Sequence, residues 1–129
     1  MKKDQFFSEN LISWYKQNKR RLPWRKNVND ENYPYKVMVS EFMLQQTGVS
    51  TVIPYFENFI NRWPTIQKLA SAREEDILLA WQGLGYYRRA RNLLKSAKQI
   101  CNQYDSKVPK SLEELQSLPG IGVYASGAI

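Results

Sequence analysis

Histidine is absent from the 129 residues, and cysteine occurs once, as Cys101. Without histidine the chain can form neither a Ser-His-Asp nor a Cys-His catalytic centre, and no imidazole is available to bind a metal ion. A single cysteine cannot form an intrachain disulfide, so a reducing compartment is indicated. No apolar run approaches the roughly 20 residues of a membrane span, and the N-terminus lacks a signal-peptide core. These absences predict a cytoplasmic protein without a membrane partner.

Acidic residues are scarce. The sequence has 12 Asp and Glu against 19 Lys and Arg, which gives a net charge of +7. No acid occurs between residues 16 and 26, or between Asp76 and Asp105. Such an excess of positive charge favours a polyanionic partner, nucleic acid before a membrane. The four Trp, eight Tyr and five Phe supply both core material and surfaces on which bases could stack.

Strand signals are also missing, because no alternation of apolar and polar residues is bounded by hairpin turns. We expect one all-α domain, large enough for a real core. Capping boxes are predicted where Ser71 precedes Glu74 and where Ser111 precedes Glu114. Pro54 would fall in the first turn of its helix, where a missing N–H costs little. The expected helices cover about 4–18, 35–46, 51–62, two short segments after Thr65 and after Ser71, 86–104 and 111–118.

The stretch from Ser40 to Thr47 places one acid, Glu41, inside an apolar run. A helix that is apolar nearly all round is usually buried. Burial disfavours the charged carboxylate, so its pKa rises and it can hold a proton near neutral pH. Glu41 is therefore a candidate general acid. The alternative is a Glu at the rim of the helix that faces water or pairs with Lys36, and spacing alone does not exclude it.

A basic stripe runs along the predicted helix at 86–104, opposite its apolar stripe. Such a stripe can follow the phosphates of a nucleic acid, or it can be an ordinary solvated face. The lack of acids in this part of the chain favours phosphates. The stripe consists of Arg88, Arg91, Lys95 and Lys98.

A helix, a Pro-Gly-apolar-Gly turn and a small-residue run close the sequence. This order is typical of a helix-hairpin-helix, in which glycines let the turn approach a phosphate and free N–H groups bind it. Gly120, Ile121 and Gly122 are the candidate phosphate-binding residues. The alternative is an ordinary turn between two helices.

Taken together, these motifs resemble the N-terminal part of the A/G-specific adenine DNA glycosylase family (MutY), within the helix-hairpin-helix glycosylase superfamily. The resemblance covers nearly the whole chain, in the family's order and spacing. It implies a six-helix-barrel type domain over 21–129 that ends inside the helix-hairpin-helix, and a helix over 1–20 that packs on a further domain. The matching segments are Leu22-Pro23-Trp24-Arg25, Ser40 to Thr47, Val52-Ile53-Pro54-Tyr55-Phe56, Gly83-Leu84-Gly85-Tyr86-Tyr87, Arg89-Ala90-Arg91-Asn92-Leu93 and Leu118-Pro119-Gly120-Ile121-Gly122.

The resemblance also implies roles for individual residues. Glu41 would protonate the target adenine, and Trp24 and Arg25 would line the pocket for the flipped base. Tyr124 would lie in the active site, where the related endonuclease III branch carries an attacking Lys; a Tyr implies hydrolysis without strand cleavage. Residues that fill the gap in the base stack are needed once a base has left the duplex. Those expected at the lesion are Leu44, Gln45, Gln46, Thr47, Leu84 and Tyr86.

The family's second catalytic carboxylate, its four 4Fe–4S cysteines and its 8-oxoguanine-reading domain would lie beyond Ile129. We therefore expect no metal to be ligated by this chain, and no adenine excision by residues 1–129 alone. The expected partner is duplex DNA with 8-oxoguanine:adenine or guanine:adenine mispairs, with no obligate protein partner. Two alternatives stay open. One is an endonuclease III-like enzyme for oxidised pyrimidines, against which Tyr124 and the cluster Gln45-Gln46-Thr47 speak; the other is a non-catalytic DNA-binding module.

Overall fold

The computed structural model describes residues 22–27, 29–45 and 47–121. All regular structure in these ranges is helical, and no strand occurs in them, so the predicted all-α class is confirmed. The first helix predicted from the sequence and the second helix of the hairpin lie outside these ranges. The elements are η2 (Pro23–Arg25), α2 (Tyr33–Leu44), α3 (Val49–Arg62), α4 (Ile66–Ala70), α5 (Glu74–Trp81), α6 (Tyr87–Gln103) and α7 (Leu112–Gln116).

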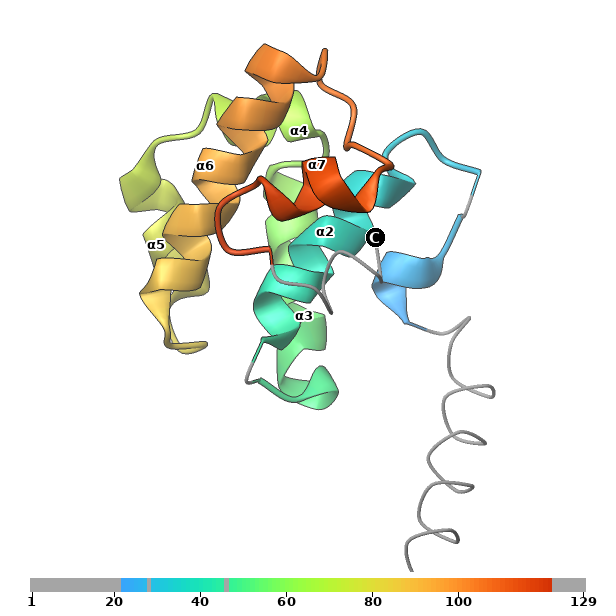
Figure 1. The fold of residues 1–129 in the computed structure, drawn as a ribbon. Helices are drawn as coiled ribbons and strands as arrows, with labels where there is room; N and C mark the ends of the chain where they lie inside the picture. Colours follow the sequence, from blue (N-terminus) through green and yellow to red (C-terminus); the bar gives the residue numbers. More distant parts are fainter. Residues whose placement is uncertain (1–21, 28, 46, 122–129) are drawn as a thin grey trace, which may run out of the picture.

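Helix α2 is the centre of the core. It packs against α3, α6 and η2, with α5 and α6 on one side of it and η2 on the other (Figure 1). Side chains on all of its faces are buried, as the apolar run predicted. Even Ser40 is buried, and its hydroxyl donates to the carbonyl of Val37 at 2.6 Å. The candidate acid Glu41 therefore belongs to the most enclosed helix of the described chain.

Two local predictions were wrong. Helix α3 begins at Val49 because Gly48, in an extended conformation, caps it; Pro54 therefore lies in the second turn and not in the first. Ser71 ends α4 and does not start α5, because its N–H donates to the carbonyls of Gln67 and Leu69. The cap at Ser111 is as predicted, and Thr65, after which a short helix was predicted, also caps its helix. Thr65 accepts from the N–H of Lys68 at 3.2 Å, and Ser111 accepts from that of Glu114 at 3.1 Å.

The loop of residues 82–86 joins α5 to α6 and depends on two glycines. Gly83 has φ +101° and Gly85 has φ +74°, both in the region that favours glycine. A Cβ at Gly83 would overlap the hydroxyl of Tyr55, whereas one at Gly85 would meet nothing within 4 Å. A side chain at position 83 would thus meet both backbone strain and overlap, whereas one at position 85 would meet backbone strain alone.

We expect Gly83→Ala to lower the free energy of unfolding by about 1–3 kcal/mol, because backbone strain is joined by the overlap with Tyr55. Gly85→Ala should lower it by only about 1 kcal/mol, from strain alone. Urea titration measures both. The double variant Gly83→Ala/Tyr55→Phe lacks the overlapping hydroxyl, so its loss should approach that of Gly85→Ala. Equal losses for both single variants would contradict this account.

Candidate nucleic-acid interface

Glu41 lies in the last turns of α2 and is half-buried. Burial raises the pKa of its carboxyl, while the charge of Arg25 acts in the opposite direction. The alternative pairing with Lys36 is wrong, because the Lys36 ammonium binds Asp30 at 3.0 Å. No cation of the described chain forms an ion pair with Glu41. The acid is therefore held where its protonated form is favoured.

Asp30 is fixed in the loop before α2. Its carboxylate accepts from the backbone N–H of Asn32 at 3.0 Å as well as from Lys36. The hydrogen bond from Asn32 and that from Lys36 lower the pKa of Asp30. The two acids near α2 are thus driven in opposite directions, Asp30 towards the charged form and Glu41 towards the neutral form.

Trp24 and Arg25 follow one another in η2 but lie in different surroundings. Trp24 is 2% exposed and packs edge-on against Phe56 of α3, with ring centroids 5.3 Å apart. Arg25 is partly exposed, and its guanidinium donates to the hydroxyl of Tyr33 at 3.1 Å. Trp24 is thus a core residue that supports η2, and Arg25 is the member of the pair near Glu41. A pocket role for either stays a prediction.

Three segments far apart in the sequence meet around one hollow of about 480 Å³. They are the end of α2, the start of α6 and the turn after α7. The side-chain amide of Gln45 donates to the carbonyl of Gly120 at 3.2 Å, which joins the first segment to the third. Residues expected at the lesion thus share a hollow with residues expected at phosphates. The lining residues are Gln45, Tyr86, Arg88, Arg89, Asn92 and Gly120.

The turn at Gly120 fits tightly against α2 and α6. Gly120 has φ +79°, and a Cβ there would lie 2.9 Å from Cβ of Asn92 and 3.0 Å from the ring of Phe42. The hydroxyl of Ser96 on α6 donates to the carbonyl of Pro119 at 2.9 Å. Ile121 is buried and its N–H donates to Leu118 at 3.3 Å, so Ile121 anchors the turn and its N–H is already engaged.

The expected lesion residues differ in exposure. Tyr86 is 62% exposed, with φ +51° in the left-handed region that a non-glycine residue rarely adopts. Leu84, in the same 82–86 loop as Tyr86, is buried, and Leu44 and Thr47 are partly buried. Of the described members of this set, Tyr86 is therefore the one that presents a large free surface.

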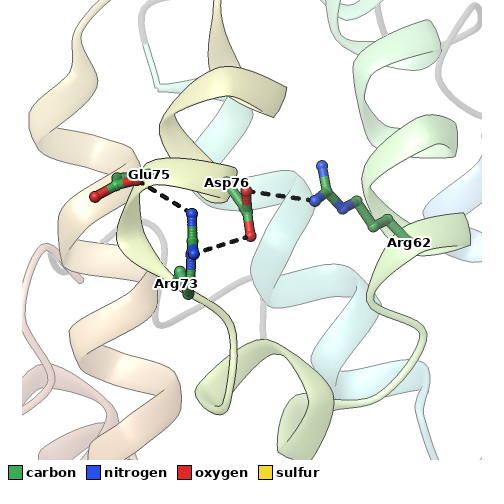
Figure 2. Close-up of polar contacts among 4 residues, drawn as sticks. All are labelled: Arg62, Arg73, Glu75 and Asp76. Atoms are coloured by element: carbon green, nitrogen blue, oxygen red, sulfur yellow. Dashed lines mark hydrogen bonds and ion pairs between the residues drawn. The ribbon is translucent and has the colours of Figure 1, made fainter.

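The predicted basic stripe is only partly free. Arg88, Lys95 and Lys98 are exposed and form no ion pair within the described ranges, whereas Arg91 lies 3.6 Å from Glu74. A separate acid–base group lies at the start of α5. There Arg73 contacts Glu75 at 3.2 Å and Asp76 at 3.8 Å (Figure 2). Asp76 also contacts Arg62 at 3.6 Å, which ties α5 to α3. Unpaired positive charge is thus found along α6, not at the start of α5.

Sequence reasoning gave Arg89 no role, yet it has more side-chain hydrogen bonds than any other described residue. It is 7% exposed, and its guanidinium donates to the end of α2 and to the loop of residues 82–86. Burial lowers the pKa of its guanidinium. The group still stays charged at neutral pH, because the ordinary pKa of Arg is so high. The signal was in the sequence: at helical spacing, position 89 falls on the apolar stripe with Leu93 and Ala97, not on the basic stripe.

Gln46, Gly122 and Tyr124 lie outside the described residues. Within the described ranges no group of His, Cys, Asp or Glu could hold a metal ion. Cys101 is partly buried, with its sulfur 3.9 Å from the carbonyl of Ile66. A 4Fe–4S cluster needs four thiolates, so these residues do not fit one. No helix in the described part of the chain is long and apolar enough to span a membrane.

Known proteins resemble the chain in sequence and in fold. The model of the HhH-GPD superfamily base excision DNA repair proteins matches residues 39–126. The chain is 49% identical over 128 residues to a rat adenine DNA glycosylase and 48% identical over 124 residues to one from Buchnera aphidicola, in each case over 95% of this chain. It spans 25% and 35% of the length of these two relatives.

Solved structures share the fold at lower identity. A thermostable thymine-DNA glycosylase superposes with a TM-score of 0.76 over 98% of this chain and 57% of its own, at 24% identity. Endonuclease III trapped on DNA superposes with a TM-score of 0.69 over 72% of this chain and 44% of its own, at 21% identity. The match of the superfamily model covers more than half of the sequence and includes the second half of α2, all of α6 and the turn at Gly120. The chain belongs to the HhH-GPD superfamily of base excision DNA repair proteins.

Proposed function

We propose that the protein is a DNA glycosylase that hydrolyses the N-glycosidic bond of adenine mispaired with 8-oxoguanine or guanine. The observation that carries the proposal is Glu41, a half-buried acid with a raised pKa on the helix that ends at the hollow. The adenine specificity rests on the 41–49% identity to adenine DNA glycosylases. The neighbours in fold are below 25% identity and support the architecture alone.

The chemistry requires a proton donor for the leaving base. Cleavage of the glycosidic bond leaves positive charge on the sugar and electrons on adenine, so a proton on adenine makes it a better leaving group. A carboxyl whose pKa is raised by burial keeps its proton to a higher pH than a free carboxyl does, and this favours its use as a proton donor. We assign this step to Glu41, with Arg25 at its side and Tyr124 in the same active site.

The base must first leave the duplex, and the gap needs a filler. Tyr86 is suited to this, because it is exposed and its ring can stack on bases. Leu44, Gln45, Gln46, Thr47 and Leu84 would surround the gap. The free charge of Arg88 and the turn at Gly120 would hold the phosphate backbone, as helix-hairpin-helix turns and basic side chains do.

Three further features are proposed from kinship with the adenine glycosylases. The whole protein carries a 4Fe–4S cluster on four cysteines other than Cys101, which is partly buried against Ile66. Residues 21–129 form a six-helix-barrel type domain, and residues 1–20 a helix that packs on another domain. The protein works in the cytoplasm, in keeping with its single cysteine.

A single-turnover assay of the protein as its gene encodes it tests the activity. Three duplexes carry adenine opposite 8-oxoguanine, adenine opposite thymine, and an oxidised pyrimidine opposite guanine. Abasic sites are revealed by alkali. We expect alkali-dependent cleavage of the first duplex alone. Cleavage of the third without alkali would favour the endonuclease III-like alternative, and tight binding without any product would favour a non-catalytic module.

Binding should depend on salt through the exposed cations of α6. Arg88→Ala is expected to reduce the slope of log affinity against log salt by about 1, because one phosphate contact is lost. Arg73→Ala is the matched control, since Arg73 is already engaged by Glu75 and Asp76 (Figure 2). Fluorescence anisotropy with an undamaged duplex at several salt concentrations measures both slopes. Equal slopes for the two variants would show that Arg88 does not contact a phosphate.

A further inference from the structure

Arg89 connects the two loops that border the hollow. One is the α2–α3 loop, residues 45–48, of which 46 lies outside the described residues; the other is the α5–α6 loop, residues 82–86. Nη1 of Arg89 donates to the carbonyls of Phe42 at 3.2 Å and Met43 at 2.7 Å, and also to that of Gln45. Nη2 donates to the hydroxyl of Thr47 at 3.1 Å and to the carbonyls of Leu84 at 3.4 Å and Gly85 at 3.2 Å.

The position is costly for a cation. Arg89 lies in the first turn of α6, where the helix dipole disfavours positive charge, and it is 7% exposed. Its partners are backbone carbonyls and one hydroxyl, and no carboxylate of the described chain contacts it. Its Nε is buried without a partner. A buried charge without a carboxylate partner is costly, and only its hydrogen bonds to neutral acceptors offset that cost, so the role of Arg89 depends on what these partners do.

The partners indicate what that role is. The last carbonyls of a helix lack intrahelical partners and carry its negative end, so the guanidinium caps α2. The same group holds the carbonyls of the α5–α6 loop, and the indole of Trp81 also donates to Gly85 at 3.2 Å. The guanidinium lies 5.3 Å from the ring centre of Tyr86 and 5.7 Å from that of Trp81. One side chain thus fixes the two loops relative to each other and supports the exposed ring of Tyr86.

We propose that Arg89 is a positioning residue for base extrusion: it holds the α2–α3 and α5–α6 loops at a fixed separation, so that side chains from both enter the base stack together. The proposal rests on the glycosylase function proposed above. Arg89 has no part in phosphate binding, because both of its terminal nitrogens are already engaged and its Nε is buried, and it has none in proton donation to adenine. Its effect falls on the step between DNA binding and bond cleavage.

Arg89→Lys tests this, because it keeps the charge but replaces two donor nitrogens by one, which cannot serve both loops. The control is Arg73→Lys, the same change at an exposed site on α5. The probe is 2-aminopurine, an adenine analogue that fluoresces when it leaves the base stack, placed opposite 8-oxoguanine. The second readout is the single-turnover rate of adenine excision at saturating protein.

For Arg89→Lys we expect loss of the fluorescence rise and a fall of about 10²-fold in the excision rate, as for a displaced reacting geometry. Affinity for undamaged duplex and its salt dependence should match those of the control, which a general loss of structure would not permit. If Arg89→Lys does not fold, Thr47→Val decides, since it removes only the link from Nη2 to the α2–α3 loop and leaves the carbonyl contacts in place. Thr47 is itself proposed to lie beside the gap, so Thr47→Ser, which keeps the hydroxyl that Arg89 holds, is the control. A fluorescence rise that is reduced in folded Thr47→Val and retained in Thr47→Ser supports the proposal.

An unchanged fluorescence rise in folded Arg89→Lys, or in Thr47→Val where Arg89→Lys is unfolded, would overturn the proposal. A wrong glycosylase function would give a different result from a wrong role for Arg89. If the unsubstituted protein neither excises adenine nor extrudes 2-aminopurine, the glycosylase function is wrong, and the inference about Arg89 fails with it. If the unsubstituted protein does both and the variant matches it, only the role of Arg89 is refuted.

Discussion

Glu41→Gln is expected to lower the single-turnover rate of adenine excision by about 10²–10⁴-fold, the usual contribution of a positioned general acid. Gln has nearly the shape of Glu but no acidic proton, so affinity for the mispaired duplex should be retained. The matched control is Glu57→Gln, at an exposed acid of α3. A full rate in Glu41→Gln would show that another group protonates the base.

The same substitution should make the protein more stable at neutral pH. The pKa of Glu41 is raised in the folded protein, so the folded state binds its proton more tightly than the unfolded chain does. Stability from this group is fully present below the unfolded pKa and is lost as the pH rises through the folded pKa. Gln carries no charge at any pH and removes that loss. Urea titrations at acid and neutral pH should show a gain for Glu41→Gln over the parent that grows with pH.

Trp24→Ala should lower the free energy of unfolding by about 3–5 kcal/mol, the range for deleting a buried Trp. Trp24 is 2% exposed and its ring contacts Phe56 of α3, so its removal leaves a cavity between η2 and α3. Trp24→Phe keeps an aromatic ring and should lose much less. Urea titration of both variants measures the difference.

The pair of Trp24 variants also separates the two roles discussed for this residue. A core role predicts that Trp24→Phe, once folded, excises adenine at nearly the parent rate. A role as the wall of the adenine pocket predicts a well-folded Trp24→Phe protein with a rate deficit and little loss of stability. The second outcome would contradict the core assignment.

The helices were predictable where an apolar stripe repeats over several turns. The segment 86–104 was predicted to within one residue of α6, because its two stripes persist along the whole helix. The start of α5 was not, because Ser71 has the right spacing from Glu74 but bonds backward to α4. Capping spacing is local, and whether a Ser ends one helix or begins the next depends on how the chain turns.

The candidate site was predictable in part. Gln45, Tyr86, Arg88 and Gly120 were singled out from the sequence, and the structure brings them around one hollow. The ion pair of Lys36 with Asp30, in place of one with Glu41, could not be predicted, because it depends on the fold of the loop before α2. Arg89 was overlooked because charged residues are assigned to solvent by default, and the carbonyls that hold it inside come from segments that only the fold brings to α6.

The sequence separation within the Arg89 contacts has a consequence for how the protein folds. Its partners at the end of α2 lie 42 to 47 residues earlier in the chain. Helices form within about a microsecond, but contacts between such distant residues must wait until the intervening chain has been ordered. We therefore expect the joining of the two loops to be a late step of folding. A partly folded chain in which α2 has formed would still lack the fixed loop separation that we propose for base extrusion.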